Sequence, residues 1–327
     1  MTRTIHEQVA KYLTDVHSIE VQALAQMRRA PDIAGDERLA AIFRDHERET
    51  ERHEQLVRRR LETLDVKPSL LKDLLAKVTG EGMVLFARSQ PDTPGKLVAH
   101  AFSYEHMELA AYELLIRVAE RAGDAPTVEL GRRIRAEEQR MGERLAERFD
   151  VAVEASLRDV APADLGAQVN KYLADAHAIE AQAIGLLSKA EKISGDPQLD
   201  EPYAEHLEES REHQRLVGER LRARGGEPTA VKDAAMRLGA LNWGLFFASQ
   251  PDTPAKLAGF AFAFEHLEIA GYELLARVAE RDNDDETVDL AQRIAAQERT
   301  AAARIASNWD GAAEASLRDL GVAAPAR

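Results

Sequence analysis

The chain of 327 residues carries a formal net charge of −14 at neutral pH, contains no cysteine, and has only 5% aromatic residues. Its length suffices for two domains with a core each, and its negative charge argues against nucleic acids and anionic membrane surfaces as partners, because both attract basic surfaces. The lack of cysteine excludes disulfides, iron–sulfur clusters and thiolate zinc sites.

Apolar spacing and capping residues predict four long helices in the first half of the chain, followed by a short fifth helix. They are expected at residues 4–29, 36–64, 93–123, 124–149 and 150–158. Asp36 is the expected N-cap of the second helix, and Pro94 suits the first position of the third. The connection between the second and third helices is long and is expected to be partly helical around residues 72–77.

The second half of the chain repeats the first at an offset of 160 residues, without insertion or deletion. For example, KYLTDVHSIE at 11–20 matches KYLADAHAIE at 171–180. The period is far longer than that of solenoid repeats, so each copy should be a complete domain. We predict an all-α protein with two tandem bundles, at 1–160 and 161–327, and a boundary in the Pro- and Gly-containing segment 160–166.

Polar residues occupy core positions of all four long helices. On the second helix the predicted buried seam consists of Leu39, Ile42, His46, Glu49, His53 and Leu56. The other helices contribute Glu20, Glu105, Glu108 and Glu138 at seam positions. Buried carboxylates are costly unless a proton or a cation neutralises them. Four helices that direct glutamates and histidines to one point therefore predict a metal site, which is how carboxylate-bridged dimetal bundles are built.

The second copy retains this set of residues. The matching positions are Glu180, His206, Glu209, His213, Glu265, Glu268 and Glu298. Flanking charges of the second helix, which we interpret as solvated, changed instead: Glu51 became Arg211, and Glu54 became Gln214. The core polar residues thus stayed while surface charges drifted.

Two motifs carry a family resemblance, and both recur in the second copy, where Ser210 replaces Thr50. They are His46-x-x-Glu49-Thr50-x-x-His53 and Glu105-His106-x-Glu108-x-Ala110-x-Tyr112. Here the sequence resembles the ferritin-like superfamily, and within it the YciF-like branch of bacterial stress-associated proteins. The resemblance implies four-helix bundles with a long crossover between helices two and three and a short fifth helix. The carboxylate ligands that it implies are Glu20, Glu49, Glu108 and Glu138, with Glu105 as a fifth.

The sequence departs from the ferritin-like pattern in its histidines. That pattern supplies Glu-x-x-His from helices two and four, whereas here Glu49 stands between His46 and His53, and Met141 follows Glu138 in place of a histidine. The identity of the metal, the number of ions per site and the redox activity therefore stay open.

The two histidines of the second helix are seven residues apart, about 10 Å along a helix, whereas paired metal ions lie about 3.5–4 Å apart. We therefore expect only one of them to be a ligand. His53 is favoured because it follows Glu49, and His46 would then orient a carboxylate. His17 is expected to hydrogen-bond Glu20, one turn away, and the core tyrosine Tyr112 to pack with a single hydrogen bond.

The leading functional hypothesis is a metal-binding, stress-related protein with one iron or manganese site per copy, which would be dinuclear in a ferritin-like domain. If the site is redox-active, oxidation of ferrous iron or removal of peroxide is the expected chemistry. One alternative is a metal-free helical scaffold with a buried polar network, and another is an oxygen-using oxidase of a small organic substrate. Whether the protein is an enzyme stays open.

The sequence contains no apolar run of membrane-spanning length and no signal-peptide pattern, so we expect a cytoplasmic protein without a membrane partner. Because ferritin-like bundles commonly pair, the fused copies are expected to form an intramolecular pseudo-dimer. Further homo-oligomerisation stays open.

Overall fold

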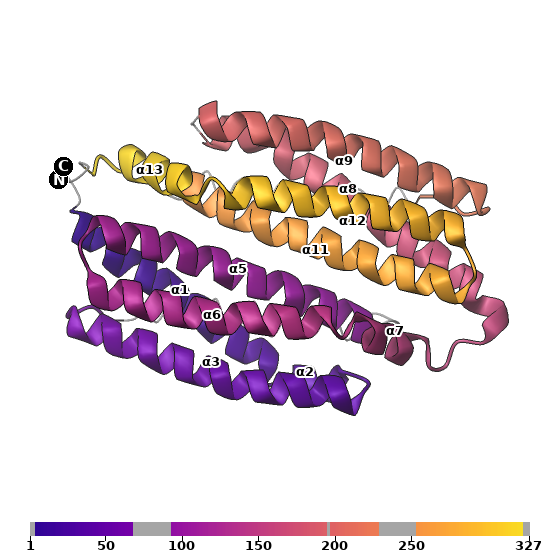
Figure 1. Cartoon of the computed structure of the whole chain (residues 1–327), viewed down its shortest axis with the longest axis horizontal. Coiled ribbons are helices and arrows are strands. Elements are labelled where there is room, and N and C mark those ends of the chain that lie inside the picture. The colour runs from indigo at the N-terminus through magenta and orange to yellow at the C-terminus, as the bar shows by residue number, and fades with distance from the viewer. Residues whose placement is uncertain (1–3, 68–92, 195–196, 229–252, 323–327) are drawn as a thin grey trace. The chain divides into compact units, whose positions relative to one another are not determined.

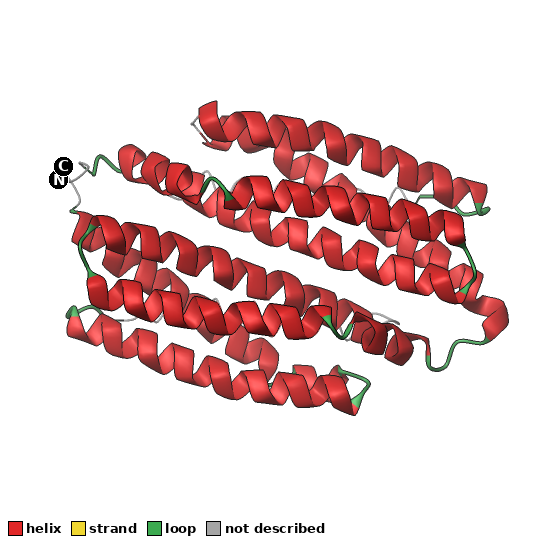
Figure 2. Ribbon diagram, in the orientation of Figure 1, coloured by secondary structure: helices red, strands yellow, loops and turns green. Residues whose placement is uncertain are grey.

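The computed structural model describes residues 4–67, 93–194, 197–228 and 253–322. Regular structure in these ranges is helical throughout and includes no strand, as predicted for an all-α protein (Figure 2). The helical segment expected at residues 72–77 lies outside the described residues. None of the described helices combines the length and the apolar character needed to cross a membrane.

The chain divides into two compact units. One comprises Met1–Arg158 with Leu320–Arg327, and the other comprises Asp159–Asp319. The helices of the first copy are α1 (Ile5–Met27), α2 (Ala30–Ile33), α3 (Glu37–Thr63), α5 (Thr93–Arg121), α6 (Ala125–Ala146) and α7 (Phe149–Leu157) (Figure 1). The second copy has a 3-10 turn, η1 (Pro162–Asp164), followed by α8 (Leu165–Ser194), α9 (Pro197–Ala223), α11 (Thr253–Arg281), α12 (Asp285–Ala306) and α13 (Trp309–Asp319).

Local capping determines where the helices of the first copy begin. The Asp36 side chain accepts a hydrogen bond from the backbone N–H of Arg38, as expected for the N-cap of α3. Asp124 caps α6 by accepting from the backbone N–H of Thr127. Gly123, just before this cap, has a φ of 68°, a left-handed conformation that glycine adopts without steric cost.

The first helix differs from its prediction because it ends at Met27, and the short helix α2 follows. Proline has no backbone N–H, and its ring clashes with the carbonyl four residues earlier. Pro31 therefore prevents α1 from continuing, and the chain starts a new helix with Pro31 in its first turn. In the second copy Glu191 stands at the equivalent position, and α8 continues without a break to Ser194.

The two bundles share one packing order. In the first copy α1 packs against α3 and α5, and α6 packs against α5 and α3. In the second copy α8, α9, α11 and α12 repeat these contacts in the same order. Each bundle thus consists of two hairpins, and the long connection between them falls between α3 and α5 or between α9 and α11, which is the ferritin-like arrangement.

The buried stripe of α3 is rotated slightly from the predicted seam. Its fully buried members are Leu39, Phe43, His46, Thr50, His53, Val57 and Leu61. Ile42, Glu49 and Leu56, which we predicted in the seam, are only half-buried. Because α3 contacts α1 on one side and α6 on the other, its deepest line lies between the two contact surfaces. This rotation keeps both histidines in the core and turns Glu49 outward.

Candidate metal centre

Each bundle encloses two overlapping groups of buried glutamates and histidines at mid-height. In the first copy the groups are His46, Glu105, Glu108 and Glu138, and Glu20, His53 and Glu138. One side-chain atom from each member lies within 4.8 Å of the corresponding atoms of the others in its group. All six side chains are completely buried, and together they come from all four long helices.

Helical spacing explains why these residues meet. Glu105 and Glu108 are three residues apart on α5 and therefore project from the same face. His46 and His53 are two turns apart on the buried stripe of α3. Glu20 comes from α1, which packs against both of these helices.

Glu138 belongs to both groups and joins them. Its Oε1 lies 2.6 Å from Nδ1 of His53, and its Oε2 lies 3.6 Å from Nε2 of His46. From the seven-residue spacing we expect only one of these histidines to be a metal ligand, and the structure places both rings at the cluster. The axial rise separates the backbones, but two long side chains can tilt toward each other from opposite ends of a two-turn interval. Both rings therefore reach the same carboxylate.

Other contacts complete the two groups. Nε2 of His46 lies 3.2 Å from Oε1 of Glu105, and Nδ1 of His53 lies 3.9 Å from Oε2 of Glu20. Tyr112 donates a hydrogen bond of 2.5 Å to the other oxygen of Glu20, Oε1. The single hydrogen bond expected for this core tyrosine is thus directed at a carboxylate of the cluster.

The second copy repeats this geometry. Its groups are His206, Glu265, Glu268 and Glu298, and Glu180, His213 and Glu298. Glu298 takes the place of Glu138, with Oε1 2.7 Å from Nδ1 of His213 and Oε2 3.5 Å from Nε2 of His206. Tyr272 donates to Oε1 of Glu180 over 2.6 Å.

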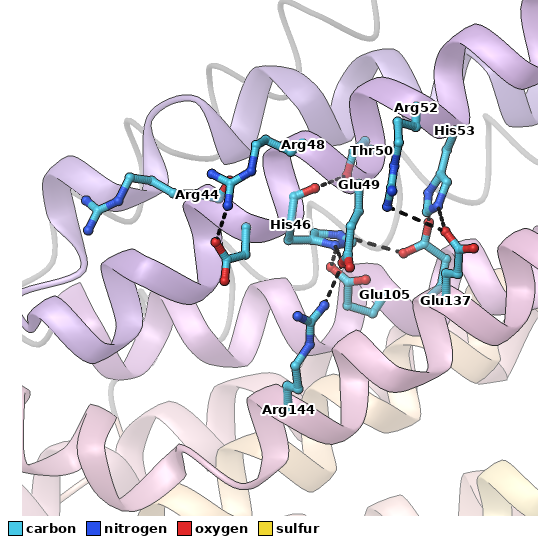
Figure 3. A network of polar contacts seen from close by, with 12 residues as sticks. Arg44, His46, Arg48, Glu49, Thr50, Arg52, His53, Glu105, Glu137 and Arg144 are labelled. Carbon is cyan, nitrogen blue, oxygen red and sulfur yellow. Dashed lines mark hydrogen bonds and ion pairs between the residues drawn. The ribbon is translucent and has the colours of Figure 1, made fainter.

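Glu49 and its counterpart Glu209 lie outside both groups, although they were predicted as ligands. Glu49 is half-buried and contacts the outer nitrogen of His46, Nδ1, at 3.4 Å (Figure 3). Its same oxygen accepts a hydrogen bond of 2.6 Å from Arg144. The hydrogen bonds from His46 and Arg144 lower the pKa of Glu49 to about 2, so this carboxylate stays ionised. Glu209 is held in the same way by His206 and Arg304.

A second outer partner, Glu137, was not identified from the sequence. Its Oε2 lies 2.7 Å from Nε2 of His53, the nitrogen that points away from the cluster (Figure 3). In the second copy Gln297 occupies this position, with its amide oxygen 3.1 Å from Nε2 of His213. Comparison of the two copies could have found Arg144, which recurs as Arg304, but not Glu137, because it changes.

Two interpretations at the neighbouring histidine His17 are corrected. Its Nε2 lies 3.0 Å from Oε1 of Glu54, on the adjacent helix, whereas we predicted a bond to Glu20 within α1. Glu54 is also only 6% exposed, and not the solvated charge that we inferred. The α1–α3 contact covers this face of α3, which the helical pattern alone assigned to solvent.

Burial dominates the electrostatics of the inner carboxylates. It raises the pKa of Glu20 to about 8 and that of Glu105 to about 7, and it raises the pKa of Glu108 well above the ordinary value. Burial would likewise raise the pKa of Glu138, but the contact with His53 lowers it overall. For a cluster that holds no cation, these shifts favour protonated carboxyls.

The histidines shift in the opposite sense to that expected from burial. Burial alone would lower the pKa of His53, but its contact with Glu138 raises it to about 9. Burial alone would lower the pKa of His46 as well, but the contacts with Glu105, Glu49 and Glu138 together raise it well above its ordinary value. Both rings therefore hold two protons when only carboxylates surround them.

The atoms that face the centre have no hydrogen-bond partners among the described residues. They are Oε2 of Glu20, Nε2 of His46, Nδ1 of His53, and both carboxylate oxygens of Glu105, Glu108 and Glu138. Although some of them lie close together, they do not meet with hydrogen-bond geometry. The outer nitrogens of both rings are bonded, so the ring nitrogens without a hydrogen bond are the two inner ones. Such a set of inward-facing oxygen and nitrogen atoms suits a cation, because buried polar atoms otherwise find hydrogen-bond partners.

The second copy differs from the first in its packing beside the cluster. Ala301 replaces Met141, and a cavity of about 10 Å³ adjoins His206, with Tyr203 and Arg304 among its lining residues. This volume is close to that of one water-sized probe. In the first copy Met141 is completely buried.

The sequence was compared with known protein families. The sequence matches the family described as "Domain of unknown function (DUF892)" over residues 4–158 and again over residues 170–318. The chain belongs to the DUF892 family. Two family matches in one chain agree with the tandem duplication, and DUF892 domains are members of the ferritin-like superfamily. No curated protein and no solved structure matched the chain.

Proposed function

We propose that each DUF892 domain of this chain binds a pair of metal ions in its buried cluster. In the first copy one ion would be held by His46, Glu105, Glu108 and Glu138, and the other by Glu20, His53 and Glu138. The second copy would use the equivalent residues. Glu138 and Glu298 would each bridge a pair, which is the role of shared carboxylates in dimetal bundles.

The observation that carries the proposal is the orientation of the two imidazoles around Glu138. Each ring has a hydrogen bond at its outer nitrogen, to Glu49 or to Glu137. The inner nitrogens face carboxylate oxygens at distances between 2.6 and 3.9 Å. An inner lone pair would repel these oxygens, so a proton between the atoms or a cation bound beside them must offset the repulsion. A metal ion in each group would satisfy its histidine and its carboxylates at once.

The donor set favours iron or manganese. Carboxylate oxygens with one imidazole per ion suit these metals, whereas zinc sites are richer in nitrogen or sulfur. Bound iron or manganese would supply one-electron redox chemistry, which would fit oxidation of ferrous iron or removal of peroxide. The motifs on α3 and α5 support a YciF-like, stress-related role within the ferritin-like superfamily.

The residues of the chain would perform defined tasks in such a site. Glu49 and Glu137 would each accept the outer N–H of a histidine and thereby keep the inner nitrogen available as a ligand. Tyr112 would hold Oε1 of Glu20, leaving Oε2 to face the centre. The closely packed helices around the cluster would exclude bulk water and strengthen these contacts.

The metal-free scaffold is the second candidate, and the short contact between His53 and Glu138 favours it. In that case doubly protonated histidines would neutralise two carboxylates, and the remaining carboxyls would stay protonated. The cluster would then define the packing of the helices without a ligand. Protons and metal ions compete for the same atoms, so a metal titration separates the two functions.

The test is metal analysis of the full chain purified after growth with added iron and manganese. Two groups in each of two domains predict four ions per chain. The double variant Glu138→Gln with Glu298→Gln keeps the side-chain shape and should lose these ions. As a control, Glu129→Gln removes an exposed charge from the same helix as Glu138 and should keep them. Metal-free protein with a melting temperature that ignores added Mn²⁺ and chelator would contradict the proposal and favour the scaffold.

A further inference from the structure

The two clusters are identical in their inner residues, and they differ in charge at the residue that contacts the outer nitrogen of one histidine. In the first copy Glu137 contacts Nε2 of His53, and in the second copy Gln297 contacts Nε2 of His213. The inner groups, the tyrosines and the outer pairs Glu49–Arg144 and Glu209–Arg304 are all the same. The Glu-to-Gln difference therefore changes the charge at one defined atom of the site without altering its shape.

Glu137 and Gln297 hold their histidine rings in the same orientation. In each copy Nε2 points to the partner oxygen and Nδ1 points to the shared glutamate, Glu138 or Glu298. The carboxylate contact is shorter, at 2.7 Å against 3.1 Å for the amide. A hydrogen bond to an ionised acceptor is stronger than one to a neutral acceptor, and it transfers more electron density to the imidazole. A negatively charged partner at Nε2 therefore favours a bound cation at Nδ1 of His53 more than the neutral amide does at Nδ1 of His213.

We propose that Glu137 and Gln297 make the two metal sites unequal, so that the first copy binds its ions more tightly and fills first. This inference rests on the proposed metal-binding function. Removing the outer hydrogen-bond partner of a ligating histidine lowers metal affinity by about 10- to 100-fold in characterised sites. Because Gln297 retains the hydrogen bond and lacks only the charge, we expect a difference near the lower end, about tenfold.

Nearby charged residues do not cancel the charge difference between Glu137 and Gln297. Arg133 and Arg52 approach Glu137 at 3.3 and 3.9 Å, but their side chains are 60% and 59% exposed, so solvent screens them. The Glu137 side chain is 17% exposed, and its contact with His53 is the shortest. In the second copy the position of Arg133 is again an arginine, Arg293, whereas Glu212 stands at the position of Arg52. Glu212 is directed to Arg215, which it meets at 2.6 Å.

The test uses the full chain with one site disabled at a time. Glu268→Gln with Glu298→Gln leaves only the first site, and Glu108→Gln with Glu138→Gln leaves only the second. Mn²⁺ affinity is measured in each background by competition with a fluorescent chelator, and circular dichroism verifies that each variant is folded. Glu137→Gln is then added to the first background and Gln297→Glu to the second. Glu129→Gln, an equal charge change on the exposed face of α6, is the matched control.

We expect the first site to bind Mn²⁺ about tenfold more tightly than the second. Glu137→Gln should remove this advantage, Gln297→Glu should create it in the second copy, and Glu129→Gln should change neither. Equal Mn²⁺ affinities of the two sites, or an advantage that survives Glu137→Gln, would overturn this inference while leaving the proposed function intact. Failure of both backgrounds and of the parent chain to bind Mn²⁺ would overturn the proposed function and this inference together.

Discussion

Nδ1 of His53 lies 2.6 Å from Oε1 of Glu138, and the other oxygen of the same carboxylate faces His46. Glu138 is the only residue common to the two groups of the first copy. Its carboxylate therefore connects two groups whose histidines are seven residues apart on α3. The predictions below follow from this shared position and from the residues that support it.

Glu138→Gln should remove both ions from the first copy, because each of its two groups loses a charged ligand. Glu108→Gln should weaken only the group that contains His46. After saturation with Mn²⁺ the Glu138→Gln chain should therefore retain fewer ions than the Glu108→Gln chain, and the unchanged second copy provides an internal reference. Equal losses in the two variants, measured by metal analysis after gel filtration, would show that Glu138 does not join the groups.

Tyr112→Phe should weaken metal binding, because the tyrosine hydroxyl positions Glu20. Tyr104→Phe is the matched control: this tyrosine is also buried, and its hydroxyl donates to the backbone carbonyl of Ile19. Each substitution should cost about 1 kcal/mol of stability for a lost hydrogen bond. Only Tyr112→Phe should lower the Mn²⁺ affinity of the first site, by about tenfold. An equal effect of both variants on affinity would assign Tyr112 a packing role alone.

The metal-free protein should lose stability as the pH rises. The pKa of Glu20 is raised to about 8, that of Glu105 to about 7 and that of His53 to about 9, so the folded domain holds protons that the unfolded chain releases. The stabilisation is complete below the ordinary glutamate value and is lost progressively between about pH 5 and pH 9. With chelator present, the melting temperature should therefore fall over this range.

Saturating Mn²⁺ should reverse the sign of this pH dependence, because metal ions replace the same protons and bind better once they are gone. The comparison is a series of thermal melts at several pH values, with chelator or with Mn²⁺. A metal-free chain that becomes more stable between pH 5 and pH 9 would contradict the electrostatic description of the cluster.

Met141→Ala should destabilise the first bundle by about 2–5 kcal/mol, the usual cost of emptying a fully buried site. Met141 is completely buried, and the second copy, with Ala301 at this position, has a cavity there. Arg140→Ala, on the exposed face of the same helix, should change stability by less than about 0.5 kcal/mol. The measurement is urea unfolding followed by circular dichroism. Equal effects of the two substitutions would show that the site collapses around the smaller side chain.

Local signals explain how much of the fold could be predicted. Caps such as Asp36 and Asp124 act on backbone groups two or three residues away, so they are visible in the sequence. The inward positions of Glu20, Glu108 and Glu138 follow from helical periodicity, which the second copy repeats. These features need no knowledge of which helices are neighbours.

The remaining features depend on how each helix is rotated about its axis. The sequence pattern cannot distinguish a seam through Glu49 from one through Thr50, and packing of α3 between α1 and α6 favours the latter. Contacts between helices, such as His17 with Glu54 and His53 with Glu137, join residues far apart in the chain. Axial rise alone also did not show that both histidine rings reach one carboxylate, because side chains several ångströms long can converge.

Anomalous scattering from Mn²⁺-soaked crystals of the full chain tests the central claim most directly. Two manganese peaks in each domain are predicted, one beside His46 and one beside His53, with Glu138 between them, and likewise around Glu298 in the second copy. Crystals in which these clusters show no manganese peak at saturating Mn²⁺, with the histidines still paired to the carboxylates, would contradict the account.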